Sequence, residues 1–313
     1  RQAGFSDVAV MTAGFTAAEL REAQFSTEDL RAAGLADSAL RVVGFQTEQQ
    51  LDVLLHLYKC TEGRGWRNGA GWREMQRQRK AQGERRSSGQ KQLPALDAAM
   101  RALLGALPGV SCEEGGEDVL RLSLPSNGLR GDLPMQLCSL SSLTHLVLSD
   151  NSLCGPLPAY LGLLVHLEHL FLDRNGFEGD IPKSLKTLTR LVVLKLESNR
   201  LTGSIPGVLG TLPYLRRLDL SCNMLSGPIP PRLCQMPSLQ ELLLHHNQLS
   251  GPLPEMGGAA LTSLQLQDNQ FRGPVPVSFS LLRGLTGLNI QNNPLEADRL
   301  QLQRMLPRCR IKM

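Results

Sequence analysis

Leucine recurs along most of the chain in the pattern LxxLxL, and each copy is followed three residues later by asparagine. The last two leucines of each copy alternate with non-leucine positions, which predicts a short strand with one buried face. Because one such unit cannot bury its leucines alone, the repeat predicts a stack of units. The asparagines are 24 residues apart, with one interval of 22, and they are Asn127, Asn151, Asn175, Asn199, Asn223, Asn247, Asn269 and Asn293.

Each unit continues as NxLxGxIP or a close variant. The glycine permits a tight bend, and the proline fixes φ at the start of the next segment. A short segment such as 208–212 then has room for one or two turns of 3₁₀ or α-helix. The asparagine side chain satisfies backbone groups where the chain turns, so stacked units are expected to align their asparagines in a ladder.

The complete unit resembles the plant-type leucine-rich repeat, LxxLxLxxNxLxGxIPxxLxxLxx, over about residues 119–296. The resemblance implies an α/β solenoid, a right-handed superhelix with a parallel sheet on its concave side, made of eight repeats of which the last is partial. Residues 297–313 are then expected to form the C-terminal cap. In that family the usual role is protein recognition, and familiar members are receptor ectodomains and inhibitors of cell-wall-degrading enzymes.

Residues 51–118 are expected to form the N-terminal cap of the solenoid. The stretch 51–72, LDVLLHLYKCTEGRGWRNGAGW, resembles the family's leucine-rich helix and glycine-rich loop, with Trp66 and Trp72 buried over the first strand. The stretch 108–124 resembles the family's WxGVxC segment. Leu107 replaces its tryptophan, however, and the cysteine that would precede it as the partner of Cys112 is missing.

A basic segment, residues 73–91, interrupts this cap with seven Lys or Arg against two Glu. Its composition predicts a solvated, mobile insertion. A basic arm that binds an acidic partner or RNA is the functional alternative, although no aromatic residue is available there to stack on bases. Residues 95–107 then read as an amphipathic helix.

Residues 1–50 carry a second periodicity, in which Phe5, Phe15, Phe25, Leu35 and Phe45 are ten residues apart. Each copy reads roughly FSxxDLRxAG, with a capping box at its start and glycine at its end. Helices of about six residues are too short to stand alone, so a small all-α stack is expected. The segment resembles ten-residue AGFSxxELRxAGF-type arrays of algal and other protist proteins.

Charge and cysteine content narrow the classes of function. A net charge of +4 is too small to indicate nucleic acid or an anionic membrane as partner, and no apolar run approaches 18 residues. The seven cysteines are scattered, odd in number and without CxxC, which argues against a zinc site and favours reduced thiols. These features favour an intracellular or organellar location, and a secreted protein is the alternative. The chain opens at Arg1 without a signal-like segment. Removal of a targeting peptide by processing is therefore an alternative that the sequence leaves open.

The sequence contains no GxGxxG, P-loop, GxSxG, HExxH or EF-hand motif, so we predict no enzyme and no cofactor. His145 and His169 occupy the same position in adjacent repeats, about one strand spacing apart. With Asp150 or Asp173 they suggest a metal site, but two surface histidines is the preferred interpretation because no third ligand is forced close. His245 and His246 are neighbours that are expected to point apart on a strand.

The variable positions of LxxLxL are expected to project from the concave face. Apolar side chains there, rimmed by charge, predict a protein-contact site, with the convex side and the N-terminal array as competing surfaces. The candidate residues are His145, Val147, His169, Phe171, Val193, Lys195, Arg216, Arg217, Asp219 and Leu243.

The sequence therefore predicts a non-enzymatic scaffold for protein–protein interaction, an accessory or structural subunit of a larger assembly. Peripheral association with a membrane complex stays open. The alternative is an extracellular recognition module, either a receptor ectodomain or an enzyme inhibitor.

Overall fold

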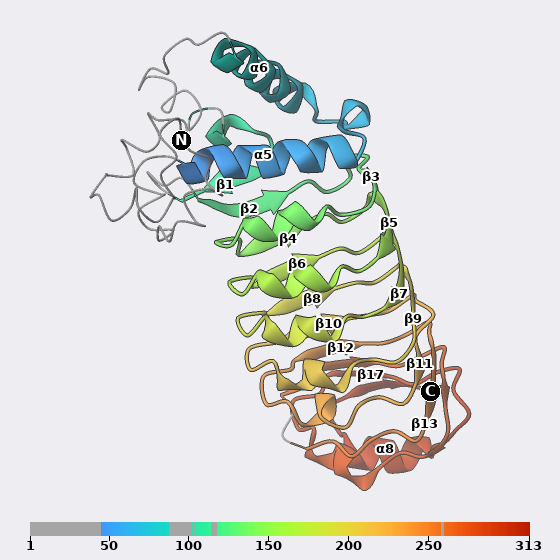
Figure 1. Cartoon of the computed structure of the whole chain (residues 1–313). Coiled ribbons are helices and arrows are strands. Elements are labelled where there is room, and N and C mark those ends of the chain that lie inside the picture. Colours follow the sequence, from blue (N-terminus) through green and yellow to red (C-terminus); the bar gives the residue numbers. More distant parts are fainter. Residues whose placement is uncertain (1–44, 88–101, 103, 114–117, 258–259) are drawn as a thin grey trace, which may run out of the picture.

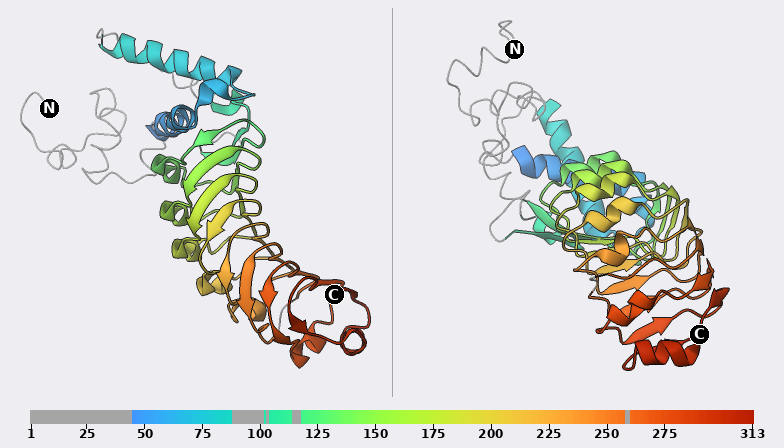
Figure 2. Two further views of the ribbon diagram at one scale, coloured as in Figure 1. Left: turned by 90° about the vertical axis from the view of Figure 1, so that its right-hand side faces the viewer. Right: turned by 90° about the horizontal axis from the view of Figure 1, so that it is seen from below.

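The computed structural model describes residues 45–87, 102, 104–113, 118–257 and 260–313, so the predicted ten-residue array lies outside the described residues up to position 44. The described residues form a curved stack of repeats between two caps (Figures 1 and 2). One ten-stranded sheet runs through the stack. Its strands, in spatial order, are β1 (Val110–Cys112), β2 (Val119–Ser123), β4 (His145–Val147), β6 (His169–Phe171), β8 (Val193–Lys195), β10 (Arg217–Asp219), β12 (Glu241–Leu243), β14 (Ser263–Gln265), β17 (Gly287–Asn289) and β19 (Arg310–Lys312).

From β2 to β19 neighbouring strands pair in parallel, and equivalent leucines face each other, as Leu146 does Leu170. In β4, β6, β8, β12 and β14 the middle residue is buried and its two neighbours are half-buried. The leucines thus form one continuous aliphatic core inside the stack. The predicted solenoid with its parallel sheet is confirmed.

The predicted asparagine ladder is present. The Asn223 side chain donates to the carbonyl oxygens of Leu196, Leu220 and Ser221 at 3.0–3.1 Å, and its Oδ1 accepts from the Leu201 backbone amide at 3.0 Å. Each Asn from 151 to 293 likewise accepts from a backbone amide of the preceding repeat. Polar groups of the turns are therefore satisfied by the next repeat in the stack.

The second half of each unit turns at the repeated glycine and then forms a 3₁₀ helix. Gly203, for example, has φ of 70°, the left-handed region that glycine enters readily. The 3₁₀ helices lie in a row along one side of the stack, and β5, β7 and β9 lie along another (Figure 1). The helices are η2 (Met135–Ser139), η3 (Ala159–Leu163), η4 (Lys183–Thr187), η5 (Gly207–Thr211), η6 (Leu233–Gln235) and η7 (Val277–Leu281). The short outer strands are β3 (Arg130–Gly131), β5 (Ser152–Pro156), β7 (Gly176–Asp180), β9 (Arg200–Thr202), β11 (Ser226–Gly227), β13 (Gln248–Gly251), β15 (Gln270–Phe271), β16 (Gly273–Pro274) and β18 (Leu295–Glu296).

Three aromatic residues close the N-terminal end of the core. Tyr58, from α5 (Phe45–Cys60), stacks on Trp72, and Trp66 packs edge-on against both rings. All three are at most 3% exposed, as expected for both tryptophans, and Trp66 follows the short η1 (Gly63–Gly65). The boundary predicted between residues 50 and 51 falls inside α5. Gln50 is buried, and its side chain donates to Asp118 and accepts from the Val119 amide at the start of β2. These bonds join the first half of α5 to the sheet.

Much of the basic segment is helical in the structure, in α6 (Ala70–Ser87), where the sequence predicted a mobile insertion. The segment is rich in Arg, Gln, Glu and Lys, which favour helix even without an apolar stripe. Trp72 and Met75 are buried, and Arg79 forms two 2.8 Å hydrogen bonds with Asp52 of α5. These contacts hold the first half of α6 against α5. Of the helix expected over 95–107, residues 102 and 104–107 are described; 102 and 104–106 are helical, and residue 107 lies in a bend.

The C-terminal cap consists of α8 (Arg299–Met305) and β19. Asp298 caps α8, since its side chain accepts a hydrogen bond from the Leu300 amide at 2.8 Å. β19 pairs in parallel with β17 and extends the sheet beyond the last repeat, while β1 extends it antiparallel at the other end. Neither terminal strand follows the LxxLxL pattern, so the repeat analysis did not predict them.

Candidate functional site

The outward side chains of the ten-stranded sheet define what we call the sheet face, the surface predicted as concave. Strands β4, β6, β8, β12 and β14 each contribute their first and third residues to it, because the middle residue is buried. The apolar members of the predicted site lie here, and each is only half-buried. They are Val147, Phe171, Val193 and Leu243.

His145 and His169 lie side by side on this face. They are paired directly in register on β4 and β6, and their rings stack with centroids 4.4 Å apart and planes 25° apart. Burial lowers the pKa of His145, and the neighbouring His169 and Arg121 lower it further, whereas Glu168 opposes them. Burial also lowers the pKa of His169, opposed by Glu168 and assisted by Arg121. Both rings are therefore held in their neutral form at pH 7.

Phe171 connects this pair to the next strands. It packs edge-on against His169 with centroids 5.9 Å apart, and Lys195 Nζ lies 5.0 Å from its ring centroid. The geometry allows a cation–π contact between the ammonium and the ring. A half-buried aromatic ring between an imidazole and an ammonium group offers a partner both apolar area and charge.

The remaining predicted residues, Arg216, Arg217 and Asp219, differ in how far their side chains are free to contact a partner. Arg217 forms ion pairs with Glu241 at 2.6 Å and Asp219 at 3.2 Å. Asp219 was expected to be exposed but is only 4% exposed, because its Oδ1 also accepts from the hydroxyl of Ser221 at 2.7 Å. Arg216 is exposed but precedes β10, outside the outward positions of the strand. Asp219 is therefore occupied by Arg217 and Ser221 and is not free for a partner. The two histidines and Phe171 lie next to one another on the face.

A row of acidic side chains borders the sheet face, and of its members the sequence analysis singled out Asp219 and Asp173 but not Glu197. Glu197 follows β8 and lies near Asp219 and Asp173, both buried. Burial, the largest cause, and the charges of Asp219 and Asp173 together raise the pKa of Glu197 to about 7. One of its carboxyl oxygens is buried without a hydrogen-bond partner among the described residues. Glu197 thus takes up a proton near neutral pH.

Replacing Glu197 by glutamine is expected to stabilise the protein above pH 7 and to have no effect near pH 4.5. In the folded state the Glu197 carboxyl group retains its proton up to about pH 7. In the unfolded chain a glutamate loses its proton near pH 4.3. Stability contributed by the protonated form is therefore lost as pH rises through that window. Urea unfolding at pH 8 should show a gain of about 1–2 kcal/mol, after allowance for solvent screening. An equal gain at pH 4.5 would contradict this assignment.

His245 and His246 are not on a strand, contrary to expectation. They follow β12 in the turn, where His246 has φ of 54°, and their rings meet edge-on with centroids 5.1 Å apart. His246 Nδ1 lies 2.8 Å from Asp268 Oδ2. Within the described parts of the chain, no group of three His, Cys, Asp or Glu side chains has an arrangement that would hold a metal ion.

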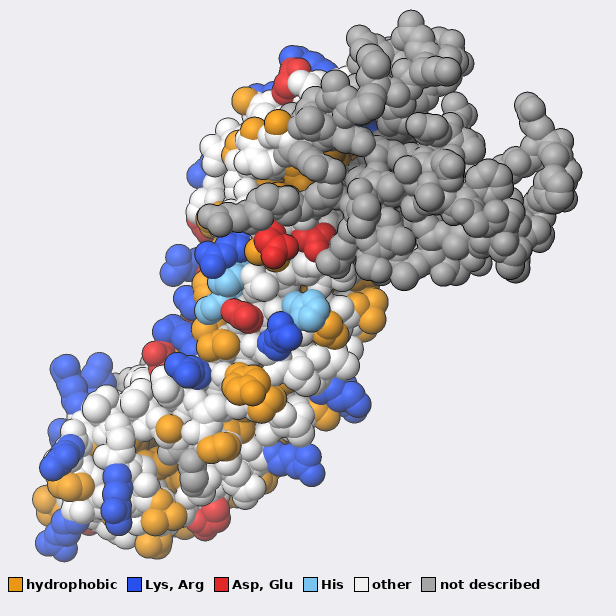
Figure 3. All heavy atoms as spheres, turned by 90° about the vertical axis from the view of Figure 1, so that its left-hand side faces the viewer, with side chains coloured by type: hydrophobic (Ala, Val, Ile, Leu, Met, Phe, Trp, Pro, Cys, Tyr) orange, Lys and Arg blue, Asp and Glu red, His pale blue; other side chains and the backbone are white. Residues whose placement is uncertain are grey.

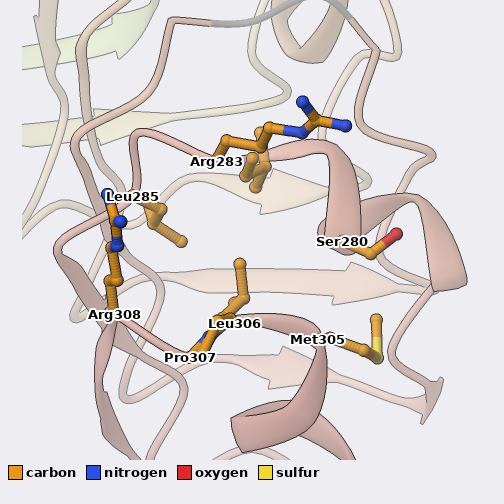
Figure 4. A pocket seen from close by; sticks show the side chains of 8 residues that line it. Ser280, Arg283, Leu285, Met305, Leu306, Pro307 and Arg308 are labelled. Atoms are coloured by element: carbon orange, nitrogen blue, oxygen red, sulfur yellow. The ribbon is translucent and has the colours of Figure 1, made fainter.

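The surface seen in Figure 3 mixes charges of both signs with hydrophobic side chains, and Lys and Arg predominate toward the C-terminal end. That end contains a pocket of about 300 Å³ lined by Arg283 and Arg308, with Leu285 between them, and by Leu306 (Figure 4). The pocket's other lining residues are Ser280, Leu282, Met305 and Pro307. No residue in this set is a carboxylate, histidine or cysteine, so the pocket offers no general base.

All seven cysteines lie in the described part of the chain, and all are free thiols. Burial raises the pKa of Cys234 to about 12 and also raises that of Cys222. Both thiols are therefore protonated at neutral pH, unlike an activated nucleophile. Among the described helices, none has the length and apolarity to cross a bilayer.

Comparison with known proteins identifies the repeats. Residues 142–164, 165–225 and 189–249 match families described as leucine rich repeat. No curated protein matches the chain.

Several solved plant receptor structures are similar to the solenoid. The plant peptide hormone receptor RGFR1 in complex with RGF2 is 34% identical, with a TM-score of 0.55, over 56% of this chain and 28% of the receptor chain. PEPR1 with AtPEP1 is 37% identical, with a TM-score of 0.59, over 61% of this chain and 27% of its own.

The leucine-rich-repeat ectodomain of the membrane receptor kinase GASSHO1/SCHENGEN3 from Arabidopsis thaliana, in complex with CASPARIAN STRIP INTEGRITY FACTOR 2, is also similar. It is 39% identical, with a TM-score of 0.53, over 54% of this chain and 20% of that chain. The present chain thus spans less than a third of each of these three structures. The chain is a protein with the leucine-rich-repeat fold, and its repeats are of the plant type.

Proposed function

We propose that this chain is a non-enzymatic recognition module that binds a protein or peptide partner on its sheet face. The observation that carries the proposal is the cluster of half-buried apolar side chains on β4, β6 and β8, with Phe171 between His169 and Lys195. Apolar area rimmed by polar and charged groups is typical of protein-contact sites. The sheet beneath is rigid because every strand is bonded to its neighbours.

An extracellular setting is supported better than the accessory subunit that the sequence favoured. The similar structures include a peptide hormone receptor and a receptor kinase ectodomain, and they are complexes with RGF2, with AtPEP1 and with CASPARIAN STRIP INTEGRITY FACTOR 2. Similarity at 34–39% identity over little more than half of this chain supports a recognition role of the same kind.

The accessory subunit of an intracellular or organellar assembly is the second candidate. Seven free thiols favour it, because oxidising compartments promote disulfides. Mass spectrometry of thiols in protein from its native source separates the two settings. Seven unmodified thiols support the accessory subunit, and two or more native disulfides support the extracellular module.

Partner capture tests the sheet face directly. The variant with Phe171→Glu and Leu243→Glu places two charges in the apolar area, and recovery of the partner from native extract should fall by about tenfold or more, because an unpaired carboxylate is costly to desolvate. Val277→Glu is the matched control, since Val277 is a 73% exposed apolar residue on η7, away from the sheet face. Equal recovery by the double variant and the wild-type protein would refute this binding site.

A further inference from the structure

Three nitrogen-bearing side chains form a row across the N-terminal end of the sheet face. Arg121 of β2 pairs in register with His145 of β4, which pairs in register with His169 of β6. We call Arg121, His145 and His169 the histidine row. The side chains project from the same side of neighbouring strands, so the three residues lie within about two strand spacings of one another.

The hydrogen bonds of Thr144 fix the tautomer of His145. The Thr144 hydroxyl donates to the Leu120 carbonyl oxygen at 2.9 Å and lies 2.9 Å from His145 Nδ1. A hydroxyl has one hydrogen, so Thr144 can only accept from His145, and the neutral ring carries its proton on Nδ1. The lone pair of His145 Nε2 is left for a further proton or for a ligand.

The side-chain nitrogen atoms of the other two members have no hydrogen-bond or ion-pair partner among the described residues either. Arg121 is exposed and forms no ion pair with any described residue, and no described residue hydrogen-bonds the ring of His169. Farther along the sheet face, the next outward positions are Val147, Phe171 and then Lys195, whose ammonium lies over the Phe171 ring. The histidine row, whose Arg121 guanidinium and His145 Nε2 have no partner among the described residues, therefore borders an apolar strip that ends in a second cation.

We propose that the histidine row and the adjoining apolar strip bind an acidic peptide segment, which places carboxylates against the row and an apolar side chain against Phe171, and that binding tightens as pH falls below 7. The proposal rests on the proposed function, since it specifies the chemistry of the partner at the same face. Arg121 within the row favours an anion over a metal cation, because like charge repels a cation.

Protonation is the source of the pH dependence. The groups that face the two rings are Arg121 from β2, Glu168 just before β6 and each ring from the other. Without a ligand, burial and Arg121 hold both pKa values low, and Glu168 compensates only in part. A bound carboxylate favours the charged imidazolium and raises both pKa values. By reciprocity, a ligand that promotes protonation binds more tightly where protons are abundant.

The experiment measures binding of a synthetic peptide, acetyl-Glu-Glu-Phe-Glu-Glu-amide, to the full chain at pH 5.5 and pH 7.5. Its carboxylates are ionised at both values, so only the protein titrates. We expect binding about tenfold tighter at pH 5.5, which corresponds to a rise of about one pKa unit on complex formation. The analogue with glutamine in place of every glutamate should bind weakly at both pH values. Equal affinity of the acidic peptide at the two pH values would overturn the proposal.

Variants assign the effect to the row. His145→Gln with His169→Gln should abolish the pH dependence, whereas Arg121→Gln should weaken binding at both pH values. His246→Gln is the control, because His246 lies outside the row and contacts Asp268 instead. NMR titration of the wild-type histidines gives an independent readout, in which the peptide should raise the pKa values of His145 and His169 alone. If pH dependence persists in the double variant, the row is not its source, while the capture experiment can still support the sheet face.

Discussion

Replacing Asn223 by alanine is expected to destabilise the solenoid by about 3–4 kcal/mol. The Asn223 side chain satisfies three carbonyl oxygens and one backbone amide at the turn between two repeats. It is 8% exposed, so water cannot replace these bonds fully. Each buried backbone group left without a partner costs about 1–3 kcal/mol, reduced where the site relaxes. Urea unfolding followed by circular dichroism measures the loss.

Asn127 is the matched comparison, because it is the first member of the ladder. Its Oδ1 accepts from the Asn68 amide at 2.7 Å, but its side-chain nitrogen is buried without a partner among the described residues. Asn127→Ala removes one good bond together with one unsatisfied group, so a loss of only about 1 kcal/mol is expected. Equal losses for the two variants would show that the ladder bonds do not determine the stability of the stack.

Replacing Trp72 by alanine is expected to cost about 3–5 kcal/mol, the usual range for a buried aromatic residue. Trp72 is fully buried, stacks on Tyr58 and packs edge-on against Trp66. Its indole Nε1 also donates to the Pro108 carbonyl oxygen at 3.2 Å. The substitution opens a cavity where the cap covers the first repeat, so amide hydrogen exchange should accelerate first in β1 and β2.

Tyr58→Phe serves as the control for that cavity. The Tyr58 hydroxyl is buried with no hydrogen-bond partner in the described structure. Removing it keeps the stacked ring and eliminates an unsatisfied polar group, so stability should stay equal or rise slightly. A large loss from Tyr58→Phe would mean that the hydroxyl has a role that the packing of the cap does not explain.

The repeat pattern predicts what faces inward much better than what faces outward. Leucine at fixed spacing determines the strands, the core and the register, because stacking is the one way to bury those side chains. The asparagines and glycines follow from the same constraint, as the ladder at Asn223 and the positive φ of Gly203 show. β19 escaped prediction because its pairing with β17 depends on the sheet edge already being present.

At the site, the sequence indicates which residues share a face but not which of them bind one another. Equivalent positions in adjacent repeats predicted the proximity of His145 and His169, whose ring centroids lie 4.4 Å apart. The burial of Asp219 did not follow from its position, since it depends on side-chain bonds to Arg217 and Ser221. The raised pKa of Glu197 likewise comes from burial and from two carboxylates in neighbouring repeats, a three-dimensional property.

Site-specific photocrosslinking tests the central claim most directly. A photoreactive amino acid replaces Val147 or Leu243 on the sheet face in one set of proteins, and Leu163 or Val277 on the 3₁₀ helices in another. After irradiation in native extract, we expect the same partner to crosslink from Val147 and Leu243 and from neither helix position. Crosslinking of that partner from Leu163 or Val277, with none from the sheet positions, would contradict recognition by the sheet face.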